Sequence, residues 1–181
     1  MIAILTQVYL SRMTLGQLLE NDQIIPDLAA RDRWGAIREL SEHLFTSERL
    51  REAQRECISS RLQERELRMT TGIGAGVAIP HALCPQMDSI VAALGLSRQG
   101  IDFQAVDSGP VHIVVLFVVP ENRYQLRLET LSAIGKSLSS PELRHRLLAA
   151  RSITDIKLVL SGRPDSKAAR AKIAAAHALD G

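Results

Sequence analysis

Aromatic residues, cysteines and long apolar runs are all scarce in this chain of 181 residues. Aromatic side chains account for 3% of the sequence, which argues against a platform for stacking nucleic-acid bases. The two cysteines, Cys57 and Cys84, are too few for a disulfide framework and lack the spacing of metal ligands. We therefore expect buried or inert thiols in a reducing cytosol, and no metal site.

The sequence also lacks an obvious membrane span or secretory leader. No apolar run reaches the roughly 18 residues that a membrane helix needs. Residues 1–10 are apolar, but they lack a basic start and a small-residue cleavage site. We therefore expect a cytoplasmic protein without stable membrane insertion. Residues 1–12 are interpreted as an N-terminal extension, because Met13 is an alternative start, and residues 163–181 as a C-terminal tail.

What the chain does have is enough apolar residues for a core, with almost no net charge. Hydrophobic residues make up 46% of the sequence and charged residues 23%, so we expect a folded domain rather than a disordered chain. The 22 basic residues nearly balance the 20 acidic ones. A broad nucleic-acid surface needs a basic excess, so nucleic acid is not an expected partner.

Apolar periodicity and capping residues predict helices on both sides of a strand-rich centre. The run at 111–119 is almost continuously apolar, which suits a strand in a sheet that is covered on both faces. Other strands are expected at 24–25, 77–80 and 90–96. Helices are expected at 14–19, 32–45, 47–66, 124–138, from Ser140 onward, and 152–162. This order indicates an α/β fold, a three-layer sandwich.

His81 is the histidine whose position points to chemistry. It directly follows the predicted strand and Pro80, and ligand sites of open α/β sheets gather at strand ends. A neutral imidazole is abundant near pH 7 and is a good nucleophile, so it suits phosphoryl acceptance. The alternative is a turn histidine that fixes the strand exit through a backbone hydrogen bond. The remaining histidines have surface or packing interpretations: His43, His112, His145 and His177.

Three glycines precede His81 within residues 70–76, which are expected to form a loop. Such a loop lets backbone N–H groups approach an anion, and a tight turn before a strand is the alternative. The Gly-x-Gly-x-Gly pattern matches neither the dinucleotide-binding fingerprint nor the Walker A loop. We therefore expect no nucleotide or other cofactor.

Four arginines are candidate partners for a phosphoryl group, because a guanidinium meets phosphate oxygens bidentately. Arg61 and Arg65 fall on the apolar side of the predicted helix and Arg68 follows closely, so periodicity does not choose among them. Arg127 falls within the apolar stripe of a later helix. A charge at such a position needs an anion, a carboxylate or an opening to solvent.

Residues 71–81, TGIGAGVAIPH, closely resemble the segment around the phosphorylated histidine of type-2 IIA domains. These domains belong to the fructose/mannitol class of the bacterial sugar phosphotransferase system (PTS), which includes the nitrogen-regulatory IIA proteins. The resemblance covers about residues 13–162, which we interpret as the domain. Further similar segments are 15–19, 103–107 before Pro110, 118–120 and 128–138.

The resemblance implies a mixed, mainly parallel sheet with helices on both faces. It implies that His81 accepts a phosphoryl group from phosphorylated HPr, a small carrier protein, or from the nitrogen-branch paralogue of HPr. It identifies Arg65 as the active-site arginine. Arg127 stands where the family usually has a second active-site histidine. An arginine keeps a donor and adds a permanent charge, which predicts firmer holding of the phosphoryl group.

Three functions are compatible with these features. The expected one is a regulatory phosphocarrier of the nitrogen branch, whose phosphorylation state acts on partner proteins. A second is a non-catalytic IIA-like module that uses the pocket at His81 as an anion sensor, which Arg127 favours. The third is a transport IIA component that serves a fructose or mannitol permease through its IIB component.

Overall fold

A mixed sheet of six strands lies at the centre of this computed structural model, which describes residues 14–162. The strands are β1 (Ile24–Ile25), β2 (Gly72–Gly74), β3 (Val77–Ala78), β4 (His81–Cys84), β5 (Val91–Ile101) and β6 (Val111–Pro120). Their order is β1-β5-β6-β3-β2, and β4 also pairs with β6. The predicted extension at 1–12 and tail at 163–181 lie outside the described residues.

The two long strands, β5 and β6, form the middle of the sheet and pair in antiparallel orientation. β1 joins β5 in parallel at the edge of the sheet, at the residues where a strand was predicted. β3 and β4 both join β6 in parallel, whereas β2 and β3 form an antiparallel pair. Three of the five pairings are therefore parallel, and the mixed sheet expected from the resemblance is confirmed.

Strands β3 and β4 follow one another along the same side of β6, with Ile79 and Pro80 between them. Proline has no N–H, so it interrupts the hydrogen-bond ladder before His81. The N–H of Phe117 still bonds the carbonyl of Pro80 at 3.0 Å, and His81 pairs with Phe117. The prediction of one strand over 77–80 with His81 after its end is therefore wrong. The first strand ends at Ala78, and His81 begins the next one.

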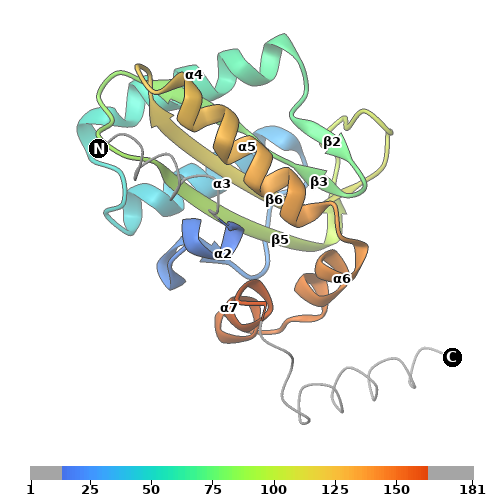
Figure 1. Ribbon diagram of the computed structural model, residues 1–181. Coiled ribbons are helices and arrows are strands. Elements are labelled where there is room, and N and C mark those ends of the chain that lie inside the picture. Colours follow the sequence, from blue (N-terminus) through green and yellow to red (C-terminus); the bar gives the residue numbers. More distant parts are fainter. Residues whose placement is uncertain (1–13, 163–181) are drawn as a thin grey trace, which may run out of the picture.

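Helices cover both faces of the sheet and give the predicted three layers (Figure 1). The helices are α2 (Leu15–Leu18), α3 (Arg33–Thr46), α4 (Arg55–Arg68), α5 (Tyr124–Leu138), α6 (Pro141–Ala149) and α7 (Ile153–Leu160), with 3₁₀ turns at Asn21–Gln23 and Glu52–Gln54. α3 and α4 pack on one face, and α2, α5, α6 and α7 on the other. Side chains of β6 alternate between the two cores, so Leu116 enters the first and Phe117 the second.

The helix boundaries follow from capping side chains. Asp32, Ser140 and Ser152 each accept a hydrogen bond from the backbone N–H three residues later, which confirms three predicted helix starts. None of the helices between residues 14 and 162 is long and apolar enough to cross a membrane.

Ser47 was predicted to begin a helix, and this prediction is wrong. Its N–H and its hydroxyl both donate to the carbonyl of His43, so Ser47 closes α3 instead. Glu48 then adopts a left-handed φ of 58°, which ends the helical path. The next α-helix begins only at Arg55.

Candidate functional site

His81 begins β4 with its side chain almost fully enclosed, because only 6% of the residue is exposed. Its Nδ1 lies 2.9 Å from the carbonyl oxygen of Ile79. A carbonyl can only accept, so Nδ1 carries the proton and Nε2 keeps a free electron pair. The ring stacks on Phe117, with 5.2 Å between centroids and an interplanar angle of 11°. Backbone and core together fix the direction of Nε2.

Both interpretations of His81 made from the sequence apply to the same side chain. The bond to Ile79 is the backbone contact expected of a structural turn histidine. That bond also sets the tautomer that leaves Nε2 able to act as a nucleophile. The structural contact is therefore compatible with chemistry at the other nitrogen.

The environment of His81 keeps its imidazole neutral. The pKa of His81 is lowered from 6.5 to about 4, chiefly by burial and also by the nearby charges of Arg65 and Arg127. The hydrogen bond to Ile79 opposes these effects only in part. Near neutral pH the ring is therefore an uncharged nucleophile rather than an imidazolium.

Arg65 is the nearest of the arginines to the histidine. Its Nε–H donates to Nε2 of His81 over 3.3 Å, and its Nη1 donates to the carbonyl of Met69 at 2.9 Å. Burial lowers the pKa of Arg65 and the charge of Glu66 opposes this effect, while the charges of Arg127 and Arg68 act in the same direction as burial. The guanidinium is thus held against the imidazole by one bond to the backbone and one to the ring.

A small cavity of about 80 Å³ lies beside His81, between α4, β4 and α5. Pockets for drug-sized ligands hold ~300–1,000 Å³, so this one suits a group of a few atoms rather than a nucleotide. All four candidate arginines from the sequence line it. The lining residues are Arg61, Glu64, Arg65, Arg68, His81, Ala82, Leu83 and Arg127.

Three of the four arginines of this cavity have no ion-pair partner within residues 14–162. Arg61 lies 3.5 Å from Glu121, but none of the ion pairs in this part of the chain involves Arg65, Arg68 or Arg127. The guanidinium of Arg127 lies over the Tyr124 ring at 4.4 Å, and its buried Nε has no hydrogen-bond partner among these residues. A neutral imidazole beside several unpaired guanidiniums makes a site for an anion.

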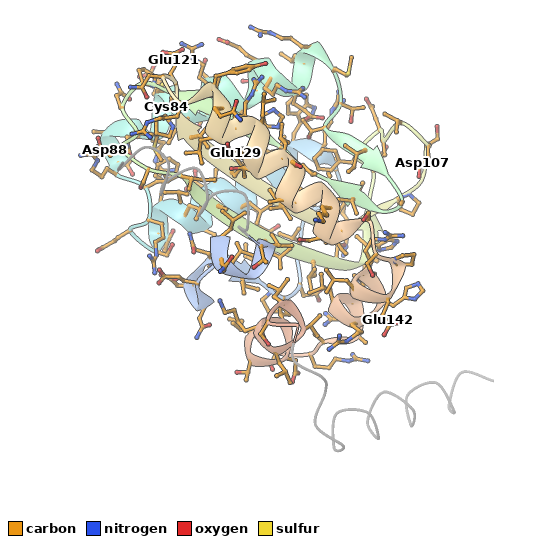
Figure 2. The ribbon with its side chains drawn as sticks, in the orientation of Figure 1. Cys84, Asp88, Asp107, Glu121, Glu129 and Glu142 are labelled. Atoms are coloured by element: carbon orange, nitrogen blue, oxygen red, sulfur yellow. The ribbon has the colours of Figure 1, made fainter. Side chains whose placement is uncertain are left out.

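The glycine segment does not take part in this cavity. Gly74, Ala75 and Gly76 form a left-handed turn between β2 and β3, with φ values of 90°, 53° and 75°. The carboxylate of Asp107 accepts from the N–H of Ala75 at 2.8 Å, so that donor is already used. In Figure 2, Asp107 lies at the opposite end of the molecule from Cys84 of β4. The tight-turn interpretation is therefore correct for residues 74–76, but the loop expected over 70–76 is wrong at Gly72–Gly74, which form β2. The turn brings no N–H group to His81.

Glu66 is a site-supporting residue that the sequence analysis missed. It is 1% exposed, and its carboxylate accepts from the backbone N–H and the hydroxyl of Thr71. These bonds fix the last turn of α4, which carries Arg65, against the start of the β2 hairpin. The available signal was spacing, because Glu66 follows the buried Ile58 and Leu62 at four-residue intervals.

The sequence family described as phosphoenolpyruvate-dependent sugar phosphotransferase system, EIIA 2, matches residues 17–162. The chain belongs to this EIIA 2 family. A nitrogen regulatory protein of Bradyrhizobium diazoefficiens is 29% identical over 156 residues, which are 86% of this chain and all of that protein. The fructose-specific EIIABC component of Bacillus subtilis is 30% identical over 140 residues. That match covers 77% of this chain but only 22% of the Bacillus protein.

Solved structures of EIIA proteins share the fold. The nitrogen regulatory protein IIA-Ntr of Neisseria meningitidis superposes with a TM-score of 0.71 at 27% identity, covering 81% of this chain and 98% of that one. Enzyme IIA for mannitol of Escherichia coli, in its complex with phosphorylated enzyme IIB, gives a TM-score of 0.65 at 17% identity. That match covers 80% of this chain and 98% of the other, and it shows the fold alone.

Proposed function

We propose that this EIIA 2 chain is a phosphocarrier that accepts a phosphoryl group on Nε2 of His81. One observation carries the proposal. An unprotonated ring nitrogen, oriented by a backbone carbonyl, lies in a small cavity lined by four arginines, of which only Arg61 has an ion-pair partner among residues 14–162. The functional unit is the domain at residues 13–162, flanked by an extension and a tail. The donor is phosphorylated HPr or its nitrogen-branch paralogue.

In the proposed reaction, Nε2 attacks the phosphorus atom of the donor's phosphohistidine. A new N–P bond forms on His81 as the donor's N–P bond breaks, and the donor nitrogen keeps that electron pair. Nδ1 retains its proton, and the carbonyl of Ile79 stabilises the positive character that develops on the ring. No proton has to leave His81, so this chain needs no general base.

The arginines would neutralise the incoming charge. Arg65 already points its Nε–H at Nε2, so the donor hydrogen bond can pass to a phosphoryl oxygen as the N–P bond forms. Arg127 comes from the opposite helical layer and offers an unpaired Nε. Two guanidiniums from different layers would then clamp the phosphoryl group and slow its departure.

Slow departure of the phosphoryl group from His81 would suit a regulatory role. A carrier that retains its phosphoryl group spends more time in a state that a partner protein can recognise. This role is supported by the match to the full length of a nitrogen regulatory relative. A transport role, with onward transfer to a IIB component, is the alternative that the fructose-specific relatives support.

Incubation with phosphoenolpyruvate, enzyme I and HPr or its paralogue, followed by intact-mass measurement, tests the proposal. We expect one acid-labile phosphoryl group on the wild-type chain and none on His81→Ala. His112→Ala is the matched control, since His112 also bonds a backbone carbonyl through Nδ1, that of Ser97, and should still be phosphorylated. Phosphorylation of the His81→Ala protein would refute the assignment.

An anion-sensing module is the second candidate, and the unpaired Nε of Arg127 favours it. Under this alternative the chain binds inorganic phosphate at the arginines but never forms an N–P bond. Phosphate titration of the His81 ring resonances, without a mass increase in the transfer assay, would select the sensor over the carrier.

A further inference from the structure

Two thiols face one another across the interface that supports the candidate site. Cys57 lies in the first half of α4 and Cys84 is the last residue of β4. Their sulfur atoms are 3.2 Å apart although the residues are 27 positions apart in sequence, and both cysteines are free. A disulfide places its sulfur atoms about 2.05 Å apart, so a bond would need a closing movement of roughly one ångström.

The two thiols differ in their access to solvent. Cys84 is completely buried, whereas Cys57 is partly exposed. Burial raises the pKa of Cys84, and its contact with Cys57 raises it further, while a hydrogen bond with the backbone of Gln86 and the charge of Arg61 oppose these effects. The outer thiol is therefore the one that a reagent in solution meets first, and the inner thiol is placed to react second.

We propose that Cys57 and Cys84 are a reversible redox pair that forms a disulfide by exchange with a small-molecule disulfide such as oxidised glutathione. The thiolate of Cys57 attacks one sulfur of the reagent, which forms a mixed disulfide and releases one thiol. The thiolate of Cys84 then attacks the Cys57 sulfur and releases the second thiol. Two protein thiols and one reagent disulfide thus give one protein disulfide and two reagent thiols.

The position of this pair connects it to the site. Arg65 follows Cys57 by about two turns on the same helix, and His81 precedes Cys84 by three residues on the same strand. A disulfide would draw α4 toward β4 and shift Arg65 relative to Nε2 of His81. Misplacement by about 1 Å can cost a reaction as much as ~100-fold in rate. This consequence rests on the proposed phosphocarrier function, whereas formation of the disulfide does not.

Intact-mass measurement after treatment with oxidised glutathione tests the pair itself. The wild-type chain should lose two hydrogens, with a proteolytic peptide that joins Cys57 to Cys84, and dithiothreitol should reverse the change. Cys84→Ser should retain one glutathione on Cys57, because the second thiol is missing. Cys57→Ser should remain unmodified. Disulfide-linked dimers, or stable glutathione on the wild-type chain, would overturn the proposal.

The effect on transfer is measured separately on the oxidised and reduced wild-type chain. We expect phosphorylation of His81 to be at least about tenfold slower after oxidation. The Cys57→Ser, Cys84→Ser double variant, given the same treatment, should show no change. An intramolecular disulfide with an unchanged transfer rate would overturn the regulatory part. If the reduced chain is never phosphorylated, the phosphocarrier proposal fails, while the mass measurement still decides the redox pair.

Discussion

The Nε–H of Arg65 donates to Nε2 of His81 across 3.3 Å, and this nitrogen is the one left free by the bond between Nδ1 and Ile79. The arginine therefore lies beside the nitrogen that would bond phosphorus in the proposed reaction. Its hydrogen bond holds the ring in the neutral tautomer before a reaction and can be exchanged during one. Several measurable properties depend on this contact and on the charges around it.

The first prediction concerns the ionisation of His81. We expect its pKa near 4 in the folded protein, because burial disfavours the imidazolium and two arginines add to the effect. An NMR titration of the ring proton resonances measures this value directly. A pKa close to 6.5 would show that the ring is open to solvent.

The second prediction concerns folding stability as a function of pH. Between pH 6.5 and about 4, the unfolded chain binds a proton at this ring that the folded chain does not. The contribution of this ring to the free energy of unfolding is therefore complete above pH 6.5 and is lost as the pH falls through this window. The loss approaches about 3 kcal/mol at the lower end of the window. Urea unfolding measures the free energy of unfolding of the wild-type chain and of His81→Gln at pH values above and within the window. The difference between the two proteins gives the contribution of the imidazole. Identical pH dependence in both proteins would contradict the assignment.

The third prediction concerns Arg65. Arg65→Ala should slow phosphorylation of His81 by ~10²–10³, because a preorganised charge contact is lost at the transition state. Arg65→Lys should recover only part of this loss, since an ammonium cannot present the planar fork. Quench-flow kinetics give the rates, and Arg51→Ala, an exposed arginine away from the cavity, is the control. Normal kinetics in Arg65→Ala would assign the role to another arginine.

The fourth prediction concerns Arg127. Removing its charge in Arg127→Ala should raise the pKa of His81, by less than the effect of burial, which is the larger cause. Arg127→His should release the phosphoryl group to an acceptor faster than the wild-type chain does. NMR titration and single-turnover transfer provide the two readouts. If neither changes, Arg127 plays no part at His81.

The fifth prediction concerns Glu66. Glu66→Ala should lower the free energy of unfolding by ~1–3 kcal/mol, because the buried N–H and hydroxyl of Thr71 lose their acceptor. Glu66→Gln keeps an acceptor oxygen and should cost less. Urea unfolding measures both changes, and Glu64→Ala, which removes an exposed carboxylate two residues away, should have little effect. Equal stability of the Glu66→Ala and Glu64→Ala proteins would contradict this role.

Much of the fold was predictable because its signals are local. The capping of α3, α6 and α7 depends on a side chain and an N–H group three residues apart, and both are visible in the sequence. The covered strand β6 was visible as a continuous apolar run. The boundary at His81 was not, because a strand that resumes after Pro80 is decided by its pairing with β6.

The site was only partly predictable for a related reason. Periodicity could not choose among Arg61, Arg65 and Arg68, and the structure explains why, since all three line the same cavity. Only the packing of α4 against β4 brings Arg65 within hydrogen-bond distance of His81. The meeting of Cys57 and Cys84 depends on the same packing, and no local pattern indicates it.

The interruption between β3 and β4 also determines what kind of contact can form there. The N–H of Ile79 already donates to the carbonyl of Thr71, and Pro80 has no N–H to offer. A visiting strand therefore finds no available donor at these two consecutive positions, which disfavours sheet extension there. The same interruption disfavours edge-to-edge pairing with another chain at Ile79 and Pro80. A protein that docked at these two residues would therefore have to be recognised through side chains.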